Sequence, residues 1–407
     1  MLSNLLQVFE PLTIEIPSSA YVHIPFCRRR CFYCDFPVSV VGDHTRGENS
    51  RSISRYVETI GQEIATTPIV GKPLETVFFG GGTPSLLSVN QIAQILASLS
   101  QQFGLSSEAE ISIEIDPGTF DLNQLQGYLL AGINRVSMGV QAFQQELLQV
   151  CGRSHSVADI WQSVEIIRSA SVPSFSLDLI SGLPHQTLAQ WQESLATAIE
   201  IAPNHISIYD LTIEPVTAFG RYYKPGIGPL PTDDITAQMY RQGKQILTTA
   251  GYEHYEISNY ALKGHQCHHN RVYWENRSYY GFGMGATSYV QGQRYTRPRK
   301  TTEYYNWVEG YSSACGVLDC PPTPSGEMLL ETLMLGLRLR EGVNLSSLSQ
   351  VFGTATGEKI YQCLQPYQKQ GWVEFLDAES SKYARLTDPE GFLFSNVVLA
   401  ALFERLT

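Results

Sequence analysis

The chain has few cysteines, no long hydrophobic run and fewer basic than acidic residues. Eight cysteines in 407 residues are too sparse for a disulfide framework, which favours a reducing compartment. No apolar run reaches the roughly 20 residues that span a bilayer. Residues 1–10 lack the basic start and the long apolar core of a secretory signal. We therefore expect a soluble, cytoplasmic protein.

The deficit of basic residues bears on the partners of the protein. The chain carries 28 Lys and Arg against 39 Asp and Glu, a formal net charge of −11. Proteins that bind a phosphate backbone usually show a basic face, so we do not expect nucleic acid as a partner. One dense basic run exists, Arg28-Arg29-Arg30. It is either a solvated loop or a local positive field near an anionic cofactor or an electron donor.

Three of the cysteines, Cys27, Cys31 and Cys34, form a compact motif, Cys-x3-Cys-x2-Cys, after a short apolar run. Three thiolates on one loop can hold three irons of a cubane iron–sulfur cluster, which four cysteines normally close. The open fourth iron suits S-adenosylmethionine, which can then accept an electron and release a 5′-deoxyadenosyl radical. A zinc loop is the alternative, but zinc sites usually pair Cys-x2-Cys with a second ligand pair. The chain has no second Cys-x2-Cys.

The first 250 residues alternate between short apolar runs and helical patterns. The pattern predicts strands at 20–24, 76–79, 111–115, 135–140, 175–180 and 205–211. It predicts helices at 53–64, 89–103, 122–131, 158–170, 188–201 and 233–250. Such alternation is typical of a parallel sheet with helices outside. Because six units do not complete an eight-stranded barrel, we expect a partial, TIM-like (β/α)6 barrel with ligands at the carboxyl ends of its strands.

Several polar residues fall at those carboxyl ends. Gly81, Gly82 and Thr83 follow the second strand, where glycines let the backbone approach a ligand closely. Glu114 lies in the third strand, and a carboxylate among apolar residues needs a cationic or polar partner. That partner is a ligand or an internal ion pair. The same logic applies to three residues further along the chain: Gln141, Arg153 and Asp178.

With these motifs in order, roughly the first 300 residues resemble the radical SAM superfamily, in the HemN/HemW family of oxygen-independent coproporphyrinogen III oxidases and heme chaperones. The resemblance implies a 4Fe-4S cluster on Cys27, Cys31 and Cys34. It also implies S-adenosylmethionine bound by Tyr21, Gly81, Gly82, Thr83, Glu114, Gln141, Arg153 and Asp178. Two further residues, Tyr33 and Thr212, match positions that line a second cofactor site in the oxidase.

Two departures separate the branches of this family. The motif of the oxidase branch contains a further cysteine two places after the third. This chain has Phe36 at that position. A phenyl ring cannot act as a thiolate, and Cys-Asp-Phe matches the chaperone branch. The second difference is the stretch 265–274, in which His-Asn-x-x-Tyr-Trp resembles the heme-binding stretch of that branch. The resemblance points to His269 as the heme ligand, with Cys267 and His268 as competitors and Tyr273 and Trp274 as ring contacts.

The proline-rich stretch 321–324 marks a linker. We therefore divide the chain into a barrel domain, 1–320, and a C-terminal domain, 321–407. The second resembles the small winged-helix-like domain of the same family. It carries 7 Lys and Arg against 10 Asp and Glu, which disfavours DNA and favours a lid or a partner surface.

The leading interpretation is a heme chaperone that passes heme to an apo-hemoprotein. Transfer could take place at the membrane surface, and the resemblance implies an electron donor such as flavodoxin or ferredoxin. One rival is an oxygen-independent coproporphyrinogen III dehydrogenase, and another is a radical SAM enzyme for a different small metabolite. Whether the protein is an enzyme does not follow from the sequence.

Overall fold

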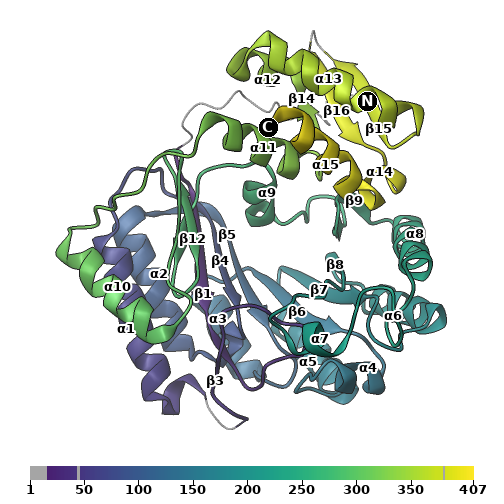
Figure 1. The fold of residues 1–407 in the computed structure, drawn as a ribbon. Helices are drawn as coiled ribbons and strands as arrows, with labels where there is room; N and C mark the ends of the chain where they lie inside the picture. Colours follow the sequence, from purple (N-terminus) through teal and green to yellow (C-terminus); the bar gives the residue numbers. More distant parts are fainter. Residues whose placement is uncertain (1–15, 44–45, 379–380) are drawn as a thin grey trace.

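The computed structural model describes residues 16–43, 46–378 and 381–407 (Figure 1). The expectation that residues 1–10 are no secretory signal therefore lies outside the described residues. The centre of the fold is a curved, open sheet. Its strands, in spatial order, are β11 (Tyr280–Phe282), β1 (Ser19–Ile24), β4 (Leu74–Gly81), β5 (Leu105–Ile115), β6 (Arg135–Gln141), β7 (Ser174–Ser181), β8 (His205–Asp210), β10 (Asn259–Ala261) and β9 (Glu253–Glu256).

The strands from β11 to β8 run parallel, whereas β10 pairs antiparallel with both β8 and β9. Helices cover the outer face of the sheet (Figure 1). They are α1 (Arg51–Thr66), α2 (Val89–Phe103), α3 (Leu122–Leu130), α4 (Gln145–Val150), α5 (Val157–Ala170), α6 (Leu188–Ile201) and α8 (Asp233–Thr249). The short helix α7 (Ala218–Tyr222) instead packs on residues 32 and 33, where the Phe219 N–H donates to the Phe32 carbonyl oxygen at 2.9 Å. The predicted partial barrel is confirmed, and the six predicted strands each lie within an observed one or within a residue of it.

Alternation along the strands separates the core from the lumen. In β5, Ile111, Ile113 and Ile115 belong to the buried core, whereas Ser112 and Glu114 line the inner cavity. Successive side chains of a strand point to opposite faces, so the isoleucines meet the helices and the polar residues face inward. Capping fixes where the helices begin. Ser88, for example, accepts a hydrogen bond from the backbone N–H of Gln91 in a capping box at the start of α2.

The sheet is wider than the sequence predicts. Strands β9, β10 and β11 have three or four residues each and were not predicted. Runs this short carry almost no periodic signal, and their strand conformation depends on pairing with neighbours distant in the chain. Beyond β11 lie a hairpin, β12 (Thr287–Val290) and β13 (Gln293–Thr296), and then α10 (Thr301–Ser313).

The C-terminal part builds a second hydrophobic core. It contains α11 (Ser325–Gly336), α12 (Leu345–Phe352), α13 (Thr354–Lys369), α14 (Glu390–Leu393), α15 (Ser395–Leu406) and a sheet of β14 (Val343–Asn344), β16 (Ser381–Leu386) and β15 (Val373–Ala378). Leu333, Ile360 and Leu402 are fully buried in this core. The boundary at residue 320 stays a prediction. Among the described residues, no helix is both long and apolar enough to cross a bilayer.

A short helix, α9 (His268–Trp274), lies between the barrel and the C-terminal helices (Figure 1). Its neighbours in the barrel come from the amino-terminal halves of the strands, where Glu110 accepts hydrogen bonds from the first backbone N–H groups of α9. Its neighbours on the other side include Glu341, which pairs with Arg271 at 3.1 Å. The helix therefore closes the end of the barrel opposite the carboxyl ends of the strands.

Candidate functional site

The cysteine loop lies directly after β1, at the carboxyl end of the sheet. Cys27 ends a two-residue strand, β2 (Phe26–Cys27), which pairs with β3 (Ser39–Val40). Burial is the main reason that the pKa of the Cys27 thiol is raised to about 12, and Asp116, Cys31 and Cys34 add to the effect. The Cys34 N–H donates to the Cys31 carbonyl oxygen at 3.3 Å, so a tight turn carries the second and third cysteines of the loop.

The glycine turn after β4 packs against this loop. A Cβ added to Gly82 would lie 2.9 Å from the Cys27 Sγ and 2.7 Å from the Phe26 carbonyl oxygen, so a side chain would not fit there. Gly81 has a φ of +116°, a region open chiefly to glycine. Its N–H donates to the Glu114 Oε2 at 2.9 Å. The turn therefore holds the backbone close to both the cysteine loop and a cavity carboxylate.

A buried ion pair lies beside the cysteines. The Arg153 Nη2 contacts the Asp116 Oδ1 at 2.5 Å, and its Nη1 lies 3.4 Å from both the Cys31 Sγ and the Tyr33 hydroxyl. Thr83 donates to the other oxygen of Asp116 at 3.1 Å. Asp116 was not singled out from the sequence, although its place after the third predicted strand was a usable signal.

Gln141 ends β6 with a φ of +71°, a conformation in which non-glycine residues are strained. A Cβ added to Gly139 would lie 3.1 Å from the Gln141 Nε2 and 3.3 Å from the Arg153 Nη2. The amide and the guanidinium therefore crowd the same glycine at the mouth of the barrel. Strain of this kind is common at ligand sites, because the surrounding fold must hold the residue in place.

These residues fit the groups that the motif implies. Within residues 16–43, 46–378 and 381–407, no three His, Cys, Asp or Glu side chains converge as the ligands of one metal ion do. A cubane cluster needs a different arrangement, because each thiolate binds a separate iron. The Arg153 Nε is buried and has no hydrogen-bond partner among the described residues. A partly unpaired guanidinium beside Cys31 suits an anionic cluster or a ligand carboxylate.

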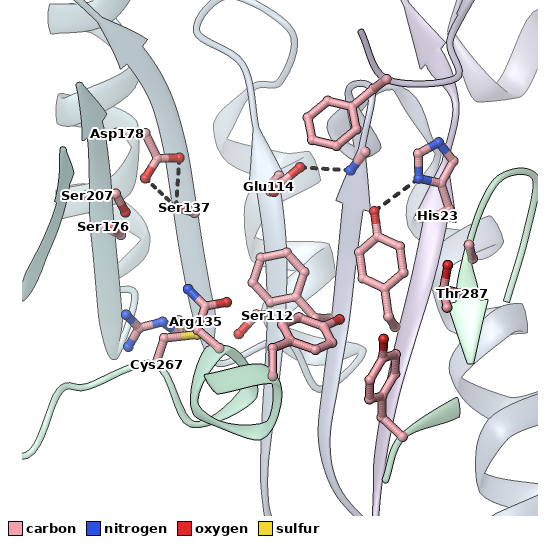
Figure 2. Close-up of a pocket in the computed structure, with 18 of the residues that line it drawn as sticks. His23, Ser112, Glu114, Arg135, Ser137, Ser176, Asp178, Ser207, Cys267 and Thr287 are labelled. Carbon is pink, nitrogen blue, oxygen red and sulfur yellow. Dashed lines mark hydrogen bonds between the residues drawn. The ribbon is translucent and has the colours of Figure 1, made fainter. Parts of the chain in front are cut away.

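Inside the sheet lies a cavity of about 400 Å³ (Figure 2). Inward-facing residues line it in two tiers. The tier near the carboxyl ends contains Glu114, Ser137, Asp178 and Ser207, and the tier near the amino ends contains Ser112, Arg135, Ser176 and His205. Most of these residues were not predicted from the sequence. Polar side chains at every second position of a strand could have indicated them.

The tier near the carboxyl ends contains two buried carboxyl groups. Burial raises the pKa of Glu114 to about 8 and that of Asp178 to about 6. The Ser137 hydroxyl lies 3.0 and 3.1 Å from the two oxygens of Asp178 (Figure 2). Buried carboxyl groups that are incompletely paired favour a cationic ligand, because a positive charge nearby stabilises their ionised form.

The structure places most of the residues expected to bind cofactor in two adjoining groups. Tyr21, Gly81, Glu114 and Asp178 line the cavity. Tyr33 lies in the cysteine loop itself, Gly82 and Arg153 lie against that loop, and Thr83 and Gln141 adjoin the ion pair of Arg153 and Asp116. Thr212 is different, since it is exposed just beyond β8 and does not line the cavity.

The stretch expected to bind heme forms α9, at the far end of the barrel from the cysteines. Cys267 and Tyr273 line the cavity there, whereas His268 is exposed and Trp274 is half-buried outside the lining. His269 is completely buried. Its Nδ1 lies 2.7 Å from the Thr76 hydroxyl and its Nε2 lies 2.8 Å from the Tyr273 hydroxyl. Burial lowers its pKa to about 3, so the ring is neutral.

A partial parallel barrel with three cysteines after its first strand and a glycine turn after the next defines a radical SAM protein. The sequence model of the Radical SAM superfamily matches residues 21–198, and that of the HemN C-terminal domain matches residues 324–393. The family implies a 4Fe-4S cluster and S-adenosylmethionine.

Among known proteins, the heme chaperone HemW of Synechocystis sp. is 47% identical over 97% of this chain and 98% of its own length. The heme chaperone HemW of Bacillus subtilis is 33% identical over 95% of this chain and 100% of its own. The coproporphyrinogen III oxidase HemN of Escherichia coli superposes with a TM-score of 0.79 at 23% identity, over 96% of this chain and 91% of that one. The last likeness concerns the fold alone. The chain belongs to the HemW family of radical SAM proteins.

Proposed function

We propose that the protein is a heme chaperone, which binds heme and transfers it to apo-hemoproteins in the cytoplasm. The observation that carries the proposal is the match to a relative named heme chaperone HemW along nearly the whole of both chains. The stretch expected to bind heme supports it, because Cys267, directly before α9, and Tyr273, within α9, line the cavity.

The cluster belongs on Cys27, Cys31 and Cys34. When bound, it and S-adenosylmethionine supply one-electron chemistry at the carboxyl ends of the strands. The chain's own residues position and neutralise these groups. Arg153 places positive charge beside Cys31, and the Gly81–Gly82 turn brings backbone groups within reach of a ligand.

An acidic electron donor of the flavodoxin or ferredoxin type complements the basic run beside the cysteines. Arg29 and Arg30 are exposed there, and exposed basic side chains steer an acidic partner at low salt. Part of this positive charge is offset, because Arg29 pairs with Asp43 at 2.7 Å. The run therefore supports a transient contact rather than a tight complex.

His269 is the proposed ligand of the heme iron, with Cys267 and His268 as the alternatives. In the described conformation both ring nitrogens of His269 are hydrogen-bonded. Ligation therefore requires the imidazole to give up one of these bonds, either the one to Thr76 or the one to Tyr273. Heme would then sit at the amino ends of the strands, away from the cysteine loop.

Phe36 argues against the oxidase alternative. Its ring lines the cavity mouth, and the residue is 54% exposed. In the oxidase motif a fourth cysteine stands at this position. A phenyl ring transfers neither protons nor electrons at this position. The chain therefore lacks one chemical group that the oxidase motif provides.

The test is anaerobic reconstitution followed by heme titration, transfer to an apo-hemoprotein and an assay for protoporphyrinogen. We expect Soret absorption and transfer without product formation from coproporphyrinogen III. The Cys27→Ala variant should lose iron and sulfide, whereas Cys315→Ala, which changes an exposed free thiol, should keep both. Turnover of coproporphyrinogen III together with absence of heme binding would overturn the proposal.

A further inference from the structure

The cavity residues near the amino ends of the strands, Ser112, Arg135, Ser176 and His205, form the floor of the cavity. This floor contains a buried cationic side chain. Arg135 is the first residue of β6, and its side chain is 5% exposed. Its Nη1 donates to the Ser174 Oγ at 3.2 Å and to the His265 carbonyl oxygen at 3.1 Å. Its Nη2 has no hydrogen-bond partner among the described residues. Half of the guanidinium fork is thus held in position and the other half is unused.

A second unused donor lies beside it. The Ser112 hydroxyl, on a residue only 1% exposed, likewise has no partner in the described part of the chain. Ser112 pairs with Arg135 across β5 and β6, so both side chains leave the same face of the sheet from backbones about 5 Å apart. Both residues line the cavity (Figure 2). Buried polar groups without partners are rare and mark a missing ligand or water.

One carboxylate lies near Arg135, on the side of the guanidinium that is already held. Glu110 approaches the Nη1 side at 4.0 Å, but both of its oxygens already accept backbone N–H groups of α9. Burial lowers the pKa of His205 well below its ordinary value, so this neighbouring ring is neutral. No carboxylate of the described residues lies within hydrogen-bond distance of the Arg135 Nη2, on the open side of the guanidinium.

We infer that the floor of the cavity is a subsite for a carboxylate group, bound by the Arg135 Nη2 and the Ser112 hydroxyl. Two donors side by side match the two oxygens of one carboxylate, and guanidinium–carboxylate hydrogen bonds are among the strongest in proteins. The tier near the carboxyl ends carries the Asp178 carboxyl group, which disfavours a second carboxylate beside it, so a ligand carboxylate is directed to the floor. The carboxylate belongs either to a propionate side chain of heme, which rests on the function proposed above, or to a free small acid.

The first experiment asks for the carboxylate itself, with no heme present. Propionate and its neutral analogue propionamide are titrated into the full-length protein by calorimetry, with thermal unfolding as a second readout. We expect propionate to bind and propionamide not to bind. The Arg135→Gln variant should bind propionate about 10- to 100-fold more weakly, as expected for a lost hydrogen bond to a charged group.

Two further variants make the result decisive. Ser112→Ala removes only a hydroxyl that has no hydrogen-bond partner in residues 16–43, 46–378 and 381–407, so it should fold normally and still bind propionate several-fold more weakly. Arg168→Gln, which changes an exposed arginine on α5, should bind like the wild type. Equal binding of propionate and propionamide, or unchanged propionate affinity in both Arg135→Gln and Ser112→Ala, would refute the subsite.

The second experiment identifies the source of the carboxylate. Heme and its dimethyl ester, in which both propionates are blocked, are titrated into the wild type and Ser112→Ala. Weaker binding of the ester, with no further loss in Ser112→Ala, would assign the subsite to a heme propionate. Equal binding of both, with propionate still recognised, would assign it to a free acid. Failure of heme to bind at all would contradict the proposed function and leave the propionate result to decide the subsite.

Discussion

The Tyr273 hydroxyl lies 2.8 Å from the Nε2 of His269, one turn away along α9. The imidazole is thereby held between Tyr273 and Thr76, with its ring stacked on Phe78 at 5.3 Å between centroids. If His269 ligates heme iron, this hydrogen bond competes with the metal. Tyr273→Phe should then bind heme as tightly as the wild type or more tightly, because it frees the Nε2 without moving the ring.

His269→Ala provides the contrast and should lose most Soret absorption. Heme titration of both variants, with His268→Ala as the control on the exposed neighbour, separates ligation from support of the helix. Should Tyr273→Phe and His269→Ala weaken heme binding to the same degree, His269 would be a structural residue and not the ligand.

The buried carboxyl group of Glu114 should make the ligand-free protein less stable as the pH rises. Its pKa is raised from 4.5 to about 8, mainly by burial. The folded state therefore binds a proton that the unfolded state has released, and the free energy of unfolding falls between about pH 4.5 and pH 8. The slope should reach up to about 1.4 kcal/mol per pH unit. Urea denaturation across this range measures it.

Glu114→Gln should remove most of that slope and leave the smaller contribution of Asp178, whose pKa is raised to about 6. A cationic ligand in the cavity should act in the opposite direction, since it stabilises the ionised carboxylate. Calorimetry of S-adenosylmethionine near pH 7, in buffers of different ionisation enthalpy, should therefore show proton release that Glu114→Gln lacks. A pH-independent stability in the wild type would contradict the assignment.

Arg153 and Asp116 should each stabilise the folded protein only while the other residue of the ion pair is present. The side chains are only 8% and 20% exposed, so removing one partner leaves an uncompensated buried charge. Arg153→Met should cost about 3–5 kcal/mol of unfolding free energy. Adding Asp116→Asn to it should recover part of that loss, which denaturant melts of the single and double variants would show. Additive losses would mean that the two side chains do not interact.

A second buried ion pair connects α1 to the segment that follows β13. Glu63 on α1 and Arg297 are both fully buried, with Nε and Oε1 2.7 Å apart. Glu63 also accepts from the Gly283 N–H at 2.9 Å and the Tyr304 hydroxyl at 2.6 Å. Glu63→Gln should therefore destabilise the protein by about 3–5 kcal/mol. The exposed pair of Arg168 and Glu165 is the matched control, and Glu165→Gln should leave the denaturation midpoint nearly unchanged.

Much of the fold could be predicted because its signals are local. The periods of two and 3.6 residues in each strand and helix depend only on neighbours along the chain. Edge strands such as β11 escaped prediction because three residues acquire strand structure only by pairing, here with β1. At the site, Glu114 and Arg153 stood out by type and position, whereas the role of Asp116 depends on a partner 37 residues away.

The cysteine loop, the glycine turn and the order of strands and helices could be predicted from the sequence, because each depends on residue types at short spacing. Where those pieces meet in space depends on contacts between segments far apart in the chain. The structure puts the histidine-bearing helix α9 at the amino ends of the strands, opposite Cys27, and it leaves the Arg135 Nη2 without a hydrogen-bond partner among the residues it describes. Such relationships arise from packing between distant segments, where burial and charge pairing select one arrangement that no local pattern records.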